Sequence, residues 1–122
     1  RTLSYSNAGH NPPLLIGADG QPGFIERGEQ PLGMFRETRY HEYYHTFKPG
    51  ETLVLYTDGV TEALSPSGEE FGRDRLVVAA RDGAGLSARE LITSMQRSVM
   101  DWTDGAGSND DATFFVIKAQ KK

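Results

Sequence analysis

The chain has 122 residues, a formal net charge of −4 and no cysteine. This length suffices for one small domain and is too short for two. The lack of cysteine excludes disulfides and thiolate metal sites, which suits a cytoplasmic protein. The acidic balance argues against nucleic-acid binding, and the basic tail over residues 118–122 is expected to be solvated. No apolar run is long enough for membrane insertion, and no signal peptide is visible.

The first half of the sequence predicts short strands separated by turns. Pro12 and Pro13 each fix a backbone angle and favour a rigid turn, and Asp19-Gly20 is typical of a hairpin turn. Residues 28–35 are expected to form an irregular loop. The predicted strands lie between these breaks, over residues 3–6, 14–16, 24–26 and 40–47.

Residues 52–57 (TLVLYT) give the strongest strand prediction. Apolar side chains on both faces indicate a central strand that is covered on both sides. Helices are then predicted over residues 60–64 and 70–82, and from Ser87, where Glu90 completes a capping box. A final strand is predicted over residues 112–119. Strands followed by helices and one more strand indicate an α+β fold.

The third predicted helix carries an apolar stripe at helical spacing, and we expect this stripe to face the core. Its members are Leu91, Met95, Val99 and Trp102. Trp102 is therefore interpreted as core or helix-end packing. The wider chain shows no internal repeat and no linker that would divide it, so residues 1–122 are expected to belong to one domain.

Acidic residues stand beside the two best strands. Asp58 follows TLVLYT, and Asp110 and Asp111 precede the final strand. If the two strands are antiparallel neighbours, these carboxylates reach the same end of the sheet. Gly59 lets the backbone approach closely, and its carbonyl oxygen could serve as a further ligand. A donor set of oxygen atoms favours Mg²⁺ or Mn²⁺ over zinc or copper.

Other interpretations of these acidic residues stay open at this point. Asp-Gly is a common turn pair, so Asp58 taken alone is more often a turn residue than a ligand. Asp110 and Asp111, which follow Gly107-Ser108-Asn109, could equally form a solvated loop. Only the convergence of the two clusters favours a metal site.

The three histidines are interpreted structurally. His10 lies between Gly9 and Asn11-Pro12, a position that favours a role in shaping the loop. His41 and His45 have a spacing that suits metal binding only on a helix. In the strand predicted over residues 40–47 both point to one face, so packing is the expected role.

Five strings in order resemble one family. They are SYSNAGHNPPLLI, PLGMF, PGETLVLYTDGVTEA, GEEFGRDRL and NDDATFFVIK, and together they cover nearly the whole chain. They resemble the C-terminal half of the stage II sporulation protein E branch of the PPM phosphatases. The resemblance implies part of a sandwich of two antiparallel β-sheets flanked by helices. It also implies a site for two Mn²⁺ or Mg²⁺ ions with Asp58 and Asp110 as ligands, and Asp111 as a second choice.

The resemblance further implies a metal-dependent protein serine/threonine phosphatase. Its substrate would be a phosphorylated regulatory protein, such as an anti-sigma-factor antagonist in bacterial partner switching. The N-terminal portion of the domain, with the remaining metal aspartates, is expected to lie outside residues 1–122. The chain alone is therefore expected to be inactive and to self-associate, while the whole protein could be tethered to a membrane sensor. The alternatives are a catalytically inactive module that binds a regulator, and a β-rich binding domain without phosphatase ancestry.

Overall fold

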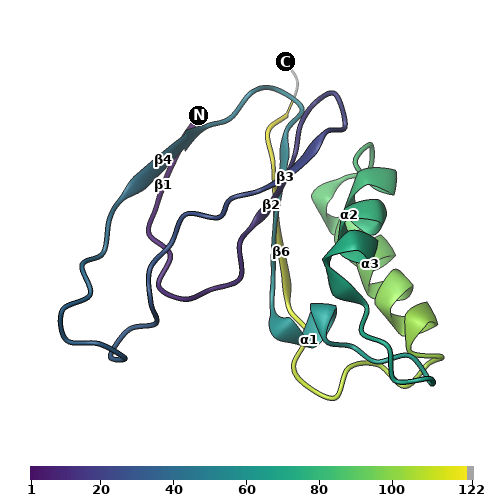
Figure 1. Ribbon diagram of the computed structural model, residues 1–122. Helices are drawn as coiled ribbons and strands as arrows, with labels where there is room; N and C mark the ends of the chain where they lie inside the picture. The colour runs from purple at the N-terminus through teal and green to yellow at the C-terminus, as the bar shows by residue number, and fades with distance from the viewer. Residues whose placement is uncertain (121–122) are drawn as a thin grey trace.

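Two β-sheets and a layer of helices make up the computed structural model, which describes residues 1–120 (Figure 1). The helices are α1 (Asp58–Thr61), α2 (Gly72–Asp82) and α3 (Ala88–Trp102). The strands are β1 (Thr2–Tyr5), β2 (Leu14–Ile16), β3 (Pro22–Phe24), β4 (Tyr43–Thr46), β5 (Thr52–Tyr56) and β6 (Phe114–Lys118). Two antiparallel sheets with helices confirm the predicted fold class. Within residues 1–120, no helix has the length and apolar character needed to cross a membrane.

The larger sheet has the strand order β3-β2-β5-β6, and every neighbouring pair is antiparallel. Strand β5 is central, as predicted, since it pairs with both β2 and β6. Val54 and Tyr56 are buried in the core beneath the helices. Leu53 and Leu55 alternate with them and face the gap toward the smaller sheet.

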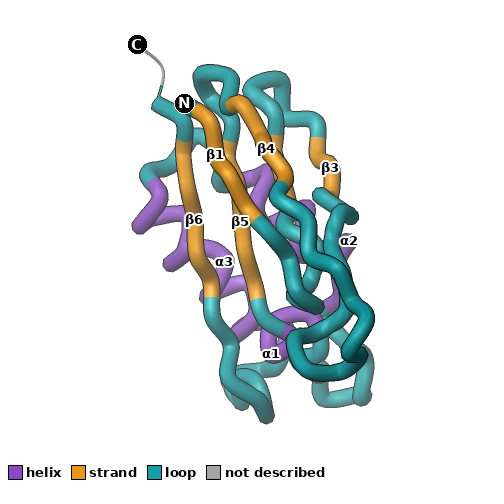
Figure 2. The backbone as a smooth tube through the Cα atoms, turned by 90° about the vertical axis from the view of Figure 1, so that its left-hand side faces the viewer, coloured by secondary structure: helices purple, strands orange, loops and turns teal. Residues whose placement is uncertain are grey.

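The smaller sheet consists of β1 and β4 alone, with Leu3 opposite His45. It lies on the side of the larger sheet away from the helices, as Figures 1 and 2 both show. Strand β4 is shorter than the predicted strand over residues 40–47. The side chains of Tyr40 and His41 bond to the loop before them, at Gln30 and Glu29, so these residues follow that loop instead of the strand ladder.

Helices α2 and α3 cover one face of the larger sheet. The predicted capping box starts α3: the Ser87 hydroxyl accepts from the Glu90 N–H at 3.2 Å, and the Glu90 carboxylate accepts from the Ser87 N–H at 3.0 Å. The apolar stripe is buried at Leu91, Met95 and Val99, as predicted. These contacts place the core between α2, α3 and the sheet.

Two helix starts differ from the prediction. Helix α1 begins at Asp58, because the Glu62 N–H donates to the Asp58 carbonyl at 2.8 Å. Helix α2 begins at Gly72, since a β-bridge between Leu64 and Glu70 holds the preceding residues in a turn.

The prediction that the basic tail over residues 118–122 is solvated is wrong for Lys118, the last residue of β6. The Lys118 ammonium group donates to the carbonyl oxygens of Ala84 and Leu86, just after α2. Burial lowers the pKa of this ammonium group. Lys118 therefore ties β6 to the helix layer, while residues 121–122 of the predicted tail lie outside the described residues.

The two methionines of α3 provide a matched test of the helix packing. Met95 is 0% exposed and Met100 is 47% exposed. Met95→Ala should lower the free energy of unfolding by about 2–5 kcal/mol, because it leaves a cavity in the core. Met100→Ala should change it by less than about 0.5 kcal/mol. Urea unfolding at one fixed protein concentration measures both values, and equal losses would contradict the assigned burial.

Candidate functional site

The pairing of β5 with β6 brings the two acidic segments to one end of the larger sheet. The final pair of the ladder is Tyr56 opposite Phe114. Beyond it, the Thr57 N–H donates to the Thr113 carbonyl at 3.2 Å, and the Thr57 hydroxyl donates to the Asp111 carbonyl at 2.9 Å. The two strands are antiparallel neighbours, which is the condition under which the sequence places both acidic segments at one end of the sheet. Asp58 directly follows Thr57, so it lies where the chain before β6 is hydrogen-bonded to the end of β5.

Gly59 lies against the backbone of Asp111. A β-carbon at position 59 would be 2.3 Å from the Asp111 carbonyl oxygen and 2.6 Å from its carbonyl carbon. Both contacts are with main chain, which cannot move aside as a flexible side chain could. The glycine of the Asp-Gly pair is thus required by close packing of two chain segments.

The segment before β6 is organised by its own polar groups. The Asp110 carboxylate accepts from the Asp111 N–H at 2.8 Å, and the Asp110 N–H donates to the Ser108 hydroxyl at 3.2 Å. Asp58, Asp110 and Asp111 are all exposed. Their carboxylates are accessible to a cation from solvent, and a shared metal remains a prediction for Asp58 and Asp110.

Asn11 is a site residue that the sequence analysis missed. Its side-chain amide donates to Oδ1 of Asp58 at 2.7 Å, across 47 positions of sequence. The segment that carries it is fixed by the Tyr56 hydroxyl, which donates to the Pro12 carbonyl at 2.8 Å. Burial raises the pKa of the Tyr56 hydroxyl, which keeps this donor protonated. Asn11 thus orients the carboxylate of Asp58.

His10 shapes the same segment, as expected from its neighbours. Its Nδ1 donates to the Asn11 carbonyl at 2.8 Å, because a carbonyl oxygen can only accept. The Asn7 side chain closes the turn, accepting from the His10 N–H at 2.7 Å and donating to the His10 carbonyl at 3.1 Å. These contacts fix the turn that presents Asn11.

The other two histidines contact different carboxylates. His45 in β4 lies 3.0 Å from Glu51 and packs edge-on against Phe47, which confirms its predicted packing role. His41 precedes β4 and is exposed, and its ring lies beside Tyr43 as predicted, with the ring centroids 6.2 Å apart. Nδ1 of His41 lies 2.7 Å from Oε1 of Glu29, so this ring also bonds to the loop before β4.

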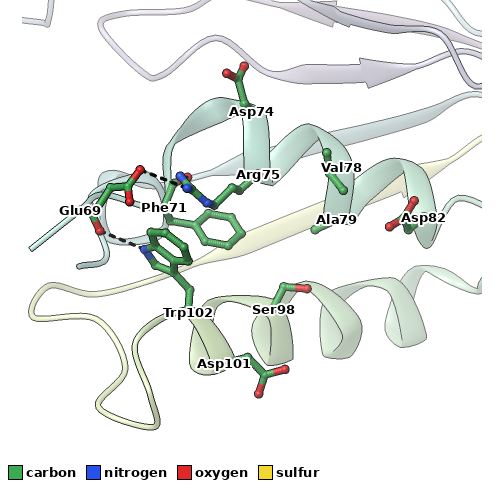
Figure 3. A pocket seen from close by; sticks show the side chains of 10 residues that line it. All are labelled: Glu69, Phe71, Asp74, Arg75, Val78, Ala79, Asp82, Ser98, Asp101 and Trp102. Carbon is green, nitrogen blue, oxygen red and sulfur yellow. Dashed lines mark hydrogen bonds and ion pairs between the residues drawn. The ribbon is translucent and has the colours of Figure 1, made fainter. Parts of the chain in front are cut away.

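A groove of about 840 Å³ lies between α2 and α3 (Figure 3). None of the predicted metal ligands lines it. Arg75 lies over the Trp102 ring at 3.7 Å from its centroid and pairs with Glu69 at 3.1 Å. The Trp102 N–H donates to the Glu69 carbonyl at 3.0 Å, which confirms the predicted packing at the end of the helix. These contacts stabilise the helix ends, and the candidate chemistry lies elsewhere.

The donor set at the end of β5 and β6 consists of oxygen atoms and suits a hard divalent cation. The predicted donors are the carboxylates of Asp58 and Asp110, the Gly59 carbonyl and, as a second choice, the Asp111 carboxylate, and this set stays a prediction. Within residues 1–120, no three Asp, Glu, His or Cys side chains gather closely enough to hold a metal ion. The described residues therefore show Asp58, whose carboxylate is held by Asn11, beside the segment that contains Asp110 and Asp111.

Comparison with known proteins identifies the family. The family described as stage II sporulation protein E (SpoIIE) matches residues 1–120, so the chain belongs to that family. The chain is similar to Protein IcfG of Synechocystis sp., with 34% identity over 94% of the chain and 18% of the relative. It is also similar to the phosphoserine phosphatase RsbU of Bacillus subtilis, with 25% identity over 95% of the chain and 34% of the relative.

A solved structure supports the fold assignment. The SiaA-PP2C domain of Pseudomonas aeruginosa matches with a TM-score of 0.81 and 19% identity, over 97% of the chain and 46% of that structure. The two antiparallel sheets and their helices thus have the fold of that PP2C domain. The chain spans less than half of each of these three proteins.

Gly59 allows a direct test of the close approach between α1 and the segment before β6. Gly59→Ala should lower the free energy of unfolding by about 1–3 kcal/mol, because the new methyl group collides with main chain. Gly85→Ala is the matched control, since a β-carbon there meets no atom within 4 Å. Its effect should stay below about 0.5 kcal/mol. Urea unfolding of both variants measures the difference, and a neutral Gly59→Ala would show that the two segments lie further apart.

Proposed function

We propose that the chain is the C-terminal part of a metal-dependent protein serine/threonine phosphatase domain. The observation that carries this proposal is the placement of Asp58 beside the segment that contains Asp110 and Asp111, with Asn11 bonded to Asp58 at 2.7 Å. Membership of the SpoIIE family and the PP2C-type fold support it. The coverage of less than half of each relative supports the view that a larger domain contains this chain.

The proposed substrate is a phosphoserine or phosphothreonine on a regulatory protein, such as an anti-sigma-factor antagonist in partner switching. RsbU, a relative at 25% identity, is a phosphoserine phosphatase. The candidate site is open to solvent, because all three of its aspartates are exposed. An open site suits a phosphoserine presented on the surface of another folded protein.

Asp58 and Asp110 would hold Mn²⁺ or Mg²⁺, with the Gly59 carbonyl and Asp111 as further candidates. When bound, these ions supply Lewis-acid chemistry, which polarises a phosphoryl oxygen and makes water a better nucleophile. The Asn11 amide fixes the direction of the Asp58 carboxylate.

Two aspartates alone supply too few ligands to hold a divalent ion firmly. Mg²⁺ keeps several waters and typically binds one or two carboxylates together with substrate phosphate, whereas a two-metal site needs a bridging ligand. We infer that the remaining aspartates come from the part of the domain outside residues 1–122. The chain would then contribute one side of the site and the strands that position it.

Removing the Asp58 charge should nearly abolish activity of the intact domain that contains residues 1–122. Phosphate release from a phosphoserine protein should require Mn²⁺ or Mg²⁺ and should fall by at least about 100-fold in Asp58→Asn, because the ligand is lost. Asn11→Ala should cost about 10–100-fold, the range typical of residues that orient a ligand. Asp19→Asn is the control, since Asp19 caps the turn at the other end of β2.

The outcomes of that experiment separate the candidate functions. Full activity of Asp58→Asn, or activity in excess chelator, would contradict the proposed metal chemistry. A folded domain that binds the regulator but releases no phosphate would favour the catalytically inactive interaction module.

The isolated chain should self-associate and release no phosphate with Mn²⁺. Strand β6 is at the edge of the larger sheet, and Phe115 is 58% exposed beside the gap between the sheets. An open edge and an exposed apolar face favour association with another copy. Sedimentation velocity should therefore show a dimer or larger species, which Phe115→Lys weakens.

The control for this test is Val78→Lys on the helical side, where Val78 is 55% exposed. It should leave the sedimentation unchanged. A monomeric chain that hydrolyses a phosphoserine peptide with Mn²⁺ would contradict the prediction.

A further inference from the structure

The groove of about 840 Å³ between α2 and α3 is not used by the proposed phosphatase site, since none of the predicted metal ligands lines it. Its middle is apolar and open: Val78 lines it and is 55% exposed, with Ala79 beside it (Figure 3). The rings of Phe71 and Trp102 line one end and meet edge to face, with centroids 6.5 Å apart. A hollow with an exposed apolar centre suits contact with side chains of another molecule.

Four of the five charged residues that line the groove are acidic. The acidic residues are Glu69, Asp74, Asp82 and Asp101, and the basic residue is Arg75. Figure 3 shows Asp74 at the outer edge of α2 and Asp101 at the outer edge of α3, on opposite sides of Val78. Both walls of the groove therefore carry a carboxylate.

The positive charge of Arg75 is already engaged by its neighbours. Its guanidinium pairs with Glu69 at 3.1 Å and lies 3.7 Å from the centroid of the Trp102 ring. The three remaining carboxylates, which we call the groove aspartates, are those of Asp74, Asp82 and Asp101. All three are exposed, and no ion pair among the described residues includes them.

The other basic residues of the two helices do not contribute to the lining. Arg73 pairs with Glu26 at 3.2 Å, outside the groove. Arg81, Arg89 and Arg97 are exposed on α2 and α3, and none of them lines the groove. The groove therefore has negative walls on either side of an apolar middle.

This charge distribution selects among possible occupants. A second copy that docked through the same groove would bring two sets of groove aspartates together, which like-charge repulsion disfavours. The same repulsion disfavours nucleic acid and anionic lipid. A protein segment with apolar side chains in its middle and lysine or arginine on both sides complements the groove in polarity and in charge.

We propose that the groove between α2 and α3 docks a basic amphipathic helix of a partner protein. The apolar face of that helix would contact Val78 and Ala79, and its basic side chains would pair with the groove aspartates. This inference goes beyond the proposed phosphatase function and does not depend on it. The groove lies in the helix layer, so a docked helix leaves the end of β5 and β6 open.

A designed peptide tests the proposal in the intact domain that contains residues 1–122. The probe is a labelled peptide of about 18 residues, or about five helical turns, with leucines on one face and lysines on both sides of it. A second peptide has the same composition in an order that has no apolar face. Fluorescence anisotropy in about 0.15 M salt should show binding of the amphipathic peptide, with the scrambled peptide about tenfold or more weaker.

Charge reversal on both walls should reverse the preference for charge. Asp74→Lys with Asp101→Lys should weaken binding of the basic amphipathic peptide by about tenfold or more. A peptide with glutamate in place of each lysine should bind this variant about tenfold or more tightly than it binds the unsubstituted domain. That gain also shows that the variant is folded, because an unfolded domain has no groove to bind the acidic peptide.

The matched control changes the net charge equally outside the groove. Glu37→Lys with Glu62→Lys replaces two exposed acidic residues that do not line the groove. Its affinity for each peptide should stay within about threefold of the unsubstituted domain, because salt screens charges that lie further away than about 8 Å.

Four results would overturn the proposal. They are no binding of the amphipathic peptide, equal binding of the scrambled peptide, binding that the groove substitutions leave unchanged, and equal losses in the control variant. Sedimentation of the domain alone gives a further test: if Asp74→Lys with Asp101→Lys changed its self-association, the groove would belong to a second copy and the proposal would fall. None of these readings depends on phosphate release, so failure of the docking surface is distinct from failure of the proposed function.

Discussion

The antiparallel pairing of β5 with β6 is the constraint on which the site depends. The ladder runs from Thr52 opposite Lys118 to Tyr56 opposite Phe114, and Thr57 extends it by bonding to the main chain of Thr113. A slip of one residue would turn every β6 side chain to the other face of the sheet. The buried positions beneath the helices fix the register, and the register fixes where the acidic segment before β6 meets the start of α1.

The segment over residues 7–13 joins the rest of the molecule to this end of the sheet. It connects β1 of the smaller sheet with β2 of the larger one. Its Asn11 holds Asp58, its Pro12 carbonyl accepts from Tyr56, and its first residues support the β3–β4 loop. One short turn therefore couples the two sheets and the oriented carboxylate. The helix layer stabilises the larger sheet from the other face and leaves this end open.

The sequence predicted the elements whose signals are local. TLVLYT marked β5, and Ser87 with Glu90 marked the start of α3. The acidic residues were placed at one sheet end because each directly adjoins a strong strand. No local pattern predicts the role of Asn11, because its contact with Asp58 spans 47 positions and depends on the path of a turn. The bonding of Lys118 was not predicted for the same reason, since the carbonyl of Ala84 that accepts from it is distant in sequence.

We propose that this strand pairing brings Asp58 and Asp110 to one metal site. A crystal structure of the intact domain grown with Mn²⁺, with anomalous diffraction to locate the ions, tests it most directly. We expect anomalous peaks at the end of β5 and β6, with carboxylate oxygens of Asp58 and Asp110 within about 2.5 Å of the ions in one cluster. Ions bound elsewhere, or a cluster that Asp110 or Asp58 does not contact, would contradict it.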